Sequence, residues 1–298
     1  MQQPLSKEVC LMKRTENQEP DYGNWVPAAM MKILAALTVV LLTAELLFLF
    51  FLENVILSVI GGIFLIATVL FTIYMWRCRV IFDFSRGGLM GEIHQYLIDH
   101  LDWNGKGTLL DIGCGAGALT IRCACRFPDA KITGMDYWSA EWSYAKEQCE
   151  RNARLEHVAD RLTFCKGDAA ALEFPDGSFD AAVSNFVFHE VRTQPDKRQV
   201  VREALRVVKQ GGSFAFQDLF SQEKLYGDMT EFIEELRQEG IGEIHYIPFV
   251  EKQGFIPGFV QAPWMLHGIG LIYGKKIPAV STFSEKAQKP SPLFSALQ

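Results

Sequence analysis

The chain lacks the features that mark several large classes of protein. Its 298 residues carry 35 acidic and 29 basic side chains, so the net charge of −6 provides no basic excess for nucleic-acid binding. None of its seven cysteines forms a Cys-x-x-Cys pair, and Cys123-x-Cys125 is too closely spaced for a usual zinc knuckle. We therefore predict no metal site, no nucleic-acid partner and reduced thiols in a cytosolic domain.

Two long stretches contain almost no charge. Residues 33–52 contain one charged side chain, that of Glu45, and residues 55–76 contain none. At about 1.5 Å per residue, each stretch is long enough as a helix to cross the ~30 Å hydrocarbon core of a bilayer. Because only two residues separate them, we expect a tight transmembrane hairpin over residues 33–76. A cleaved signal peptide is not expected, because the first apolar stretch starts late, has no small-residue cleavage site and is followed by a second apolar stretch.

Basic residues flank both outer ends of this hairpin, whereas its turn contains Glu53. By the positive-inside rule we expect both ends in the cytoplasm, so that residues 1–32 form a cytoplasmic segment and the domain after the hairpin is cytoplasmic. The basic residues are Lys7, Lys13, Arg14 and Lys32 before the hairpin and Arg77, Arg79 and Arg86 after it.

Glu45 is the one ionisable residue inside the first apolar stretch. Such a group is a functional candidate by default, because burying it in lipid is costly. A single acid without a basic partner makes a poor transport pathway. We therefore expect Glu45 to pack within the hairpin, reaching toward the headgroups or bonding to Ser58 or Thr68.

A glycine-rich turn follows an apolar strand in the remainder of the chain. Residues 109–117 read Leu-Leu-Asp-Ile-Gly-Cys-Gly-Ala-Gly. Glycines at 113, 115 and 117 allow a sharp turn and close approach to a ligand, and residues 118–122 can begin a helix. The spacing also fits a nicotinamide dinucleotide fingerprint. Asp111 favours a different ligand, because a carboxylate there repels a pyrophosphate but suits the cationic amino-acid portion of S-adenosylmethionine.

Further strands and a helix follow in order. Residues 131–136 read as a strand that ends in Asp136, a candidate for binding both ribose hydroxyls. Residues 162–169 contain a third strand, after which Asp168 can accept a hydrogen bond from the adenine amino group. A fourth strand over 179–185, an amphipathic helix over 200–208 and a strand over 213–216 complete the pattern.

With these motifs, residues from about 82 to 276 resemble the class I S-adenosylmethionine-dependent methyltransferases. The resemblance implies an α/β fold with a Rossmann-like seven-stranded sheet, parallel except for an antiparallel terminal strand, preceded here by the two transmembrane helices. It also implies S-adenosylmethionine as the cofactor. Gln210 replaces the proline that the family usually has before its Gly-Gly turn. By resemblance, the cofactor-binding residues are Asp111, Gly113, Cys114, Gly115 and Gly117 in the first motif, Asp136 and Tyr137, Asp168 and Ala169, and Asn185 at the end of the fourth strand.

The predicted organisation has five parts. Residues 1–32 form the N-terminal segment, 33–76 the hairpin, 77–106 a linker and lid helix, 107–276 the methyltransferase domain and 277–298 a disordered tail.

Within the methyltransferase domain, a helix is expected over about 228–238 and a terminal antiparallel strand pair over 255–260 and 266–273. Deleting residues 1–76 is expected to leave cofactor affinity nearly unchanged, because no cofactor motif lies there.

The methyl acceptor is the open question at this point. His189 and Glu190 follow the fourth strand, where an acceptor would approach the sulfonium, and His189 is a candidate general base or a polar lining residue. Because in-line methyl transfer draws much of its rate from proximity, no base is required. Three functions remain: a membrane-anchored methyltransferase of a small or lipid-like acceptor, a methyltransferase of a soluble metabolite or protein with the hairpin as tether, or a non-catalytic membrane sensor. The sequence makes no prediction of oligomeric state.

Overall fold

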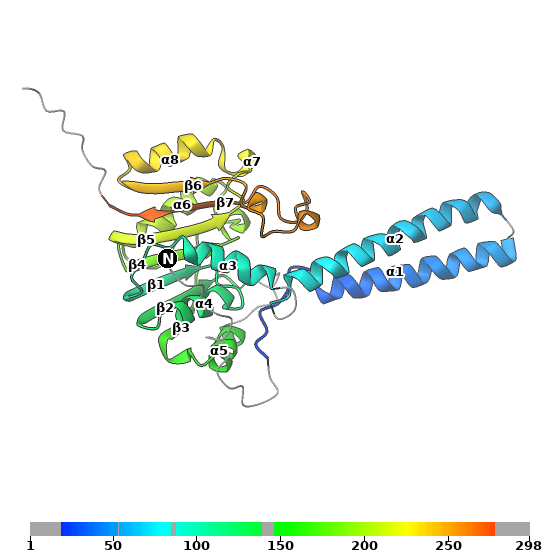
Figure 1. Ribbon diagram of the computed structural model, residues 1–298, viewed down its shortest axis with the longest axis horizontal. Coiled ribbons are helices and arrows are strands. Elements are labelled where there is room, and N and C mark those ends of the chain that lie inside the picture. The colour runs from blue at the N-terminus through cyan, green and yellow to red at the C-terminus, as the bar shows by residue number, and fades with distance from the viewer. Residues whose placement is uncertain (1–18, 53, 85–87, 139–145, 278–298) are drawn as a thin grey trace, which may run out of the picture.

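The computed structural model describes residues 19–52, 54–84, 88–138 and 146–277. An α/β domain carries two long helices that project together from one side (Figure 1). Several residues of the sequence predictions lie outside the described ranges, namely the basic residues Lys7, Lys13, Arg14 and Arg86, the turn residue Glu53 and the tail 278–298.

The two projecting helices form an antiparallel hairpin. Helix α1 spans Ala28–Leu47 and continues through a π-helical turn, Phe48–Leu52, and α2 spans Val55–Phe82. Both are long and apolar enough to cross a membrane, and the most apolar stretch of each helix is not buried in protein. At the domain end of α2, by contrast, Met75, Cys78 and Phe82 are buried. The structure differs from the predicted linker, because α2 continues without a break through residues 77–82.

Glu45 lies inside the hairpin, where it faces the other helix. It is 9% exposed, and a Cβ atom added to Gly61 would lie 2.2 Å from its Oε2 atom. The side chain therefore packs against a position that only glycine leaves open. The expected hydrogen bonds are not found: Thr68 donates to the carbonyl of Phe64 instead, and Oε2 has no partner among the described residues.

The domain is built on a seven-stranded sheet with the order β3-β2-β1-β4-β5-β7-β6. The pairings among β1 to β5 are parallel, and β7 runs antiparallel to both of its neighbours, β5 and β6. This arrangement confirms the predicted fold class. The strands are β1 (Gly107–Ile112), β2 (Ala130–Asp136), β3 (Leu162–Lys166), β4 (Phe179–Asn185), β5 (Val208–Asp218), β6 (Glu243–Ile247) and β7 (Gly270–Lys275).

Helices cover both faces of the sheet, and each face has its own apolar cluster. The neighbouring residues Leu109 and Leu110 of β1 belong to different clusters, as alternation along a strand buried on both sides requires. Helices α3, α4 and α5 pack in the first cluster, and α6 and α8 pack in the second. The helices are α3 (Leu89–Asp99), α4 (Ala118–Arg126), α5 (Lys146–Leu155), α6 (Lys197–Arg206), α7 (Glu223–Tyr226) and α8 (Met229–Gln238), with short 3-10 turns at Ala159–Arg161, Phe188–Glu190, Val250–Lys252 and Gly258–Val260.

The predicted strand over residues 255–260 was wrong. That segment contains the 3-10 turn Gly258–Val260, and the partner of β7 is Glu243–Ile247. Pro257 explains the difference, since proline has no N–H to donate to a strand ladder. The helix expected over 228–238 is present as α8.

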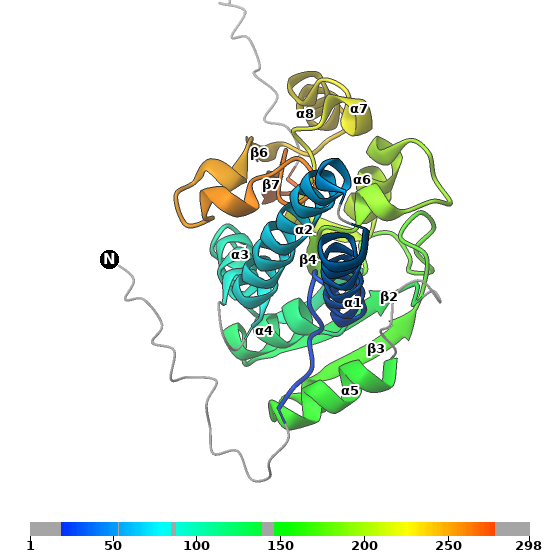
Figure 2. The same cartoon turned by 90° about the vertical axis from the view of Figure 1, so that its right-hand side faces the viewer.

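The sheet is oriented so that the carboxyl ends of its parallel strands point toward the base of the hairpin (Figure 1). A view along the hairpin shows α1 and α2 in front of the sheet, with α4 and α5 below them (Figure 2). In parallel α/β sheets ligands bind at the carboxyl ends of the strands. The hairpin therefore starts beside the edge at which the predicted cofactor residues lie.

Candidate functional site

The glycine-rich turn leaves β1 in a shape that requires glycine. Gly113 has a φ of 75°, and a Cβ atom there would lie 2.2 Å from a methyl group of Val187. The amides of Gly113 and Cys114 donate to the carbonyl of Met135 at 2.7 and 3.0 Å, which holds the turn against the end of β2. Gly117, with a φ of 84°, then begins α4.

Asp111 lies beneath this turn. It is 1% exposed, and its Oδ2 atom accepts a hydrogen bond of 2.5 Å from the hydroxyl of Thr120 on α4. Burial raises the pKa of Asp111 to about 7, in spite of this hydrogen bond, and the nearby Asp136 acts in the same direction. The carboxyl group therefore titrates near neutral pH, and a cation placed beside it would favour its charged form.

Asp136 lies at the tip of β2, as predicted for a ribose ligand. One carboxylate oxygen accepts from the amide of Gly115 and the other from the amide of Trp138, both at 2.8 Å. Each oxygen retains a lone pair for a hydroxyl group. The neighbouring Tyr137 is 55% exposed, and the Nζ atom of Lys166 lies 5.5 Å from its ring centroid. A carboxylate with spare acceptors beside an exposed ring suits the ribose and adenine of an adenosyl group.

Two further predicted residues follow β3, and one lies in the glycine turn. Asp168 accepts from the amide of Ala170 and from the hydroxyl of Thr193, at 2.9 and 3.0 Å. Its carboxylate therefore also holds a local turn, and Ala169 beside it is buried. Burial raises the pKa of the Cys114 thiol, so this side chain is a neutral lining group.

Asn185, at the end of β4, pairs with a residue that the sequence predictions missed. Its Oδ1 atom accepts a hydrogen bond of 2.9 Å from Gln217. The Oε1 atom of Gln217 is buried and has no partner within the described part of the chain. A buried acceptor without a donor is costly, and a ligand N–H or O–H at this edge would satisfy it.

His189 and Glu190 lie in the turn after β4 and meet a third group, Asp218. The Nδ1 atom of His189 is 2.8 Å from Asp218, and its Nε2 atom is 3.5 Å from Glu190. Burial alone would lower the pKa of His189, but the two carboxylates outweigh it and raise the pKa to about 10. The same contact lowers the pKa of Glu190. This raised pKa favours the protonated imidazolium at neutral pH, which argues against His189 as a general base.

Asp218 organises this turn from the end of β5. It is 1% exposed and also accepts from the amides of Phe188 and Leu219, at 2.8 and 2.6 Å. The signal that could have identified Asp218 was available, because it ends a strand at the same sheet edge as Asp136.

The segment before α1 crosses the site, where the sequence placed only a cytoplasmic extension. We call residues 19–27 the strap. The amide of Asp21 donates to Asn152 Oδ1, and Asn152 Nδ2 donates to the carbonyls of both Asp21 and Ala116. Buried Asn152 thus joins the strap to the glycine turn. The strap is therefore linked through Asn152 to the glycine turn, so a deletion of residues 1–76 would also remove a support of this turn, which the sequence prediction of unchanged cofactor affinity did not include.

Aromatic residues connect the strap to the sheet edge and to the base of the hairpin. The ring centroid of Trp25 lies 4.8 Å from that of Phe186, which follows β4, and 5.4 Å from that of Phe82 at the end of α2. Tyr22 lies 5.1 Å from Phe84. Together they form an apolar wall between the hairpin and the end of β4.

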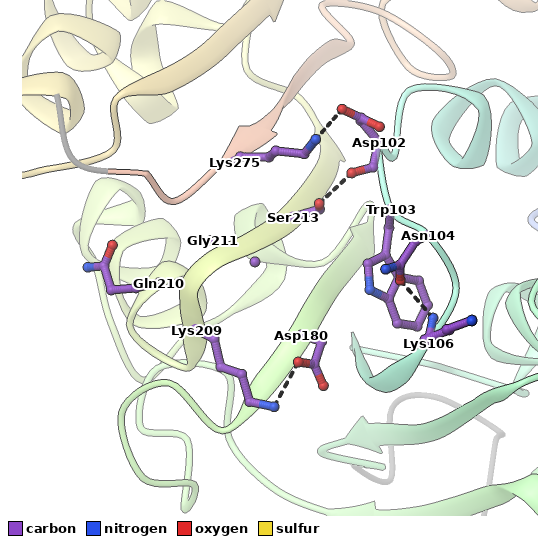
Figure 3. Close-up of a pocket in the computed structure, with 11 residues that line it drawn as sticks. Asp102, Trp103, Asn104, Lys106, Asp180, Lys209, Gln210, Gly211, Ser213 and Lys275 are labelled. Carbon is purple, nitrogen blue, oxygen red and sulfur yellow. Dashed lines mark hydrogen bonds and ion pairs between the residues drawn. The ribbon is translucent and has the colours of Figure 1, made fainter. Parts of the chain in front are cut away.

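A hollow of about 430 Å³ lies at the opposite, amino edge of the sheet (Figure 3). Ion pairs border it, between Lys209 and Asp180 and between Lys275 and Asp102. None of the predicted cofactor residues lines it. The glycine turn and the acids after β2 and β3 therefore identify the candidate site better than this hollow does.

Residues 110–216 match a family model described as a methyltransferase domain. The chain is 34% identical to a sterol 24-C-methyltransferase from Aspergillus fumigatus over 122 residues, covering 41% of this chain and 30% of that protein. It is 32% identical to a 27-O-demethylrifamycin SV methyltransferase from Amycolatopsis mediterranei over 151 residues, covering 50% and 51%. The chain thus spans about half or less of these relatives. The structure of geranyl diphosphate C-methyltransferase from Streptomyces coelicolor is 17% identical with a TM-score of 0.46, covering 63% of this chain and 79% of that one.

The matched region begins in β1, contains the glycine turn and the ends of β2, β3 and β4, and ends within β5. It therefore includes every residue that the sequence analysis assigned to cofactor binding, and it does not include the strap. The family model, these relatives and the seven-stranded sheet support a class I S-adenosylmethionine-dependent methyltransferase domain in this chain, with S-adenosylmethionine as its cofactor.

Proposed function

We propose that the protein is a membrane-anchored methyltransferase that methylates a small, apolar or lipid-like acceptor taken from its own membrane. One observation carries the proposal: the carboxyl edge of the sheet lies at the base of the apolar hairpin, where Trp25 contacts both Phe186 and Phe82. An acceptor that leaves the bilayer along this wall reaches the cofactor edge without crossing water.

S-adenosylmethionine supplies an electrophilic methyl group when it is bound. In this proposal Asp136 accepts from both ribose hydroxyls and Tyr137 lies against the adenine. Asp168 accepts from the adenine amino group, and Asp111 holds the cationic amino-acid end. The glycine turn supports this assignment, because the absence of side chains lets the backbone approach the ligand.

His189 acts as a positioning residue in this proposal. Its protonated ring ties Glu190 to Asp218, and Asp218 holds the amide of Phe188. The contact fixes the turn that follows Phe186 and thereby the wall for the acceptor. Orientation of the acceptor against the methyl group supplies the rate enhancement, so no protein base is needed.

Three observations support the choice of acceptor and anchor. The most apolar stretch of each hairpin helix is not buried in protein. The named acceptors of the two curated relatives, a sterol and a demethylrifamycin, are small molecules. The basic residues at both ends of the hairpin favour a cytoplasmic domain.

A cysteine placed at Asn54 should then react with an impermeant reagent in intact cells while Cys10 stays unlabelled, and the reverse pattern would invert the topology.

The function is tested by supplying full-length protein in vesicles with methyl-labelled S-adenosylmethionine and a total membrane extract. We expect the label in the organic phase, and little label with Asp136→Asn. Label confined to the aqueous phase or to protein would support a soluble metabolite or a protein as acceptor. Binding of S-adenosylhomocysteine without any turnover in any fraction would support a sensor.

A further inference from the structure

The loop between β6 and β7, residues 248–269, is long and has few charged groups. Its ionisable side chains are Glu251, Lys252 and His267. Glu251, the one acid, is 1% exposed and accepts from the amides of Gly268 and Ile269, both at 3.0 Å. The loop therefore presents no acid to an anionic surface.

This loop is a folded unit anchored by its own core. Five apolar side chains spread along it are buried, each 2% exposed or less: Val250, Ile256, Val260, Leu266 and Ile269. Two aromatic side chains remain exposed, Trp264 at 69% and Phe249 at 39%. The side chain of Trp264, large and apolar, is therefore available for a contact outside the domain.

The loop packs against α2 near the domain end of the hairpin. The hydroxyl of Tyr74 donates to the carbonyl of Phe259 at 3.0 Å, and the guanidinium of Arg77 lies 4.9 Å from the centre of the Phe259 ring. The side chain of Trp264 approaches the same Tyr74 hydroxyl. Figures 1 and 2 both show the loop, in orange, beside the base of α2.

The length of α2 sets the depth of this contact. The roughly 20 residues from Val55 to Tyr74, at about 1.5 Å each, match the ~30 Å hydrocarbon core. Tyr74 and the exposed Trp76 then lie in the interfacial layer, where amphipathic aromatic rings are favoured, and Arg77 lies among the headgroups.

We propose that residues 248–269 form a second membrane contact, with Trp264 inserted in the interfacial layer of the bilayer that holds the hairpin. This rests on the proposed function, because it takes α1 and α2 as membrane spans. The hairpin attaches the domain to the membrane at one place, beside the strap and the end of β4. A second contact on the β6–β7 side fixes the carboxyl edge of the sheet against the membrane surface.

Photo-crosslinking of full-length protein in nanodiscs of phosphatidylcholine and phosphatidylglycerol tests the proposal. Benzoylphenylalanine replaces one residue at a time: Trp264 as the test position, Phe64 on α2 as the membrane control, and Gln210 at the amino edge as the aqueous control. All three side chains are exposed in the structure, so the substitutions leave the core intact. Equal binding of S-adenosylhomocysteine by the three proteins confirms that they fold alike.

We expect lipid adducts at positions 64 and 264 and none at 210. Adducts at 64 without adducts at 264 would overturn the second contact and leave the membrane-anchored enzyme standing. Absence of adducts at both positions would overturn the membrane placement itself. Adducts at all three positions would show unspecific adsorption of the domain and would also overturn the proposed contact.

Discussion

Replacing Asp218 with asparagine should destabilise the protein in a pH-dependent way. The buried carboxylate accepts hydrogen bonds from the His189 ring and from the amides of Phe188 and Leu219. The NH₂ group of an asparagine would face one of these N–H groups, and two donors cannot pair. Removing one partner of a buried ion pair costs about 3–5 kcal/mol. At pH 6, where His189 is protonated in both states, we expect the free energy of unfolding to fall by that amount.

The pH dependence follows from the raised pKa of His189. The folded protein retains a proton up to about pH 10, whereas an unfolded histidine releases it near pH 6.5. The stabilisation is complete below pH 6.5 and is lost as the pH rises through 10, at about 1.4 kcal/mol per unit between these values. Between pH 7 and pH 9 the unfolding free energy of the unsubstituted protein should thus fall by roughly 3 kcal/mol. The Asp218→Asn protein should not show this fall, because it lacks the carboxylate that raises the pKa of His189.

Urea unfolding of full-length protein in detergent micelles, followed by tryptophan fluorescence, measures this difference. The gap in unfolding free energy between the two proteins should narrow steadily from pH 7 to pH 9. Glu190→Gln is the matched control, since Glu190 is 46% exposed and lies 3.5 Å from the ring. Glu190→Gln should lower the unfolding free energy much less than Asp218→Asn does. A gap that stays constant with pH, or a His189 that titrates near pH 6.5 by NMR, would refute the reasoning.

The remaining predictions concern the cofactor edge and the strap. Asp136→Asn should weaken S-adenosylhomocysteine binding by about 1–3 kcal/mol in calorimetry, because a hydroxyl pair loses a charged acceptor; unchanged affinity would remove Asp136 from the site. Gly113→Ala should unfold at lower urea than Gly88→Ala, because both have a φ near 75° but only the first meets a side chain, that of Val187. Equal midpoints would contradict this. Asn152→Ala should free the strap, seen as faster proteolysis of residues 19–27, and weaken S-adenosylhomocysteine binding; slow proteolysis with unchanged binding would show that the strap holds without Asn152.

The fold could be predicted because its determinants are local in the sequence. Apolar residues that run into glycines or into an acid indicate both the strand and the edge at which it ends, as in β1, which ends just before Gly113, and β2, which ends at Asp136. The hairpin is equally local, since composition alone marks two apolar helices. The strand partner of β7 was misplaced because apolar residues around Pro257 resemble a strand, while the proline prevents the ladder.

The contacts across the site could not be predicted, because they join residues far apart in the chain. Asp21 and Asn152 are 131 positions apart, and no periodicity relates them. The protonation of His189 likewise depends on Asp218, 29 positions away, and on the burial of both groups. Glu45 shows the same limit within the hairpin: its packing inside the helix pair was expected, but its proximity to Gly61 depends on the register of two helices.

The central claim is that the site collects its acceptor from the bilayer that holds the hairpin. It is tested most directly by comparing two mixtures of vesicles, with labelled S-adenosylmethionine in the water. In one, the enzyme and the extracted membrane lipids share the same bilayer; in the other, they occupy separate vesicles that do not fuse. The account predicts methylated lipid in the shared bilayer and almost none across separate vesicles. Equal labelling in both mixtures would contradict it.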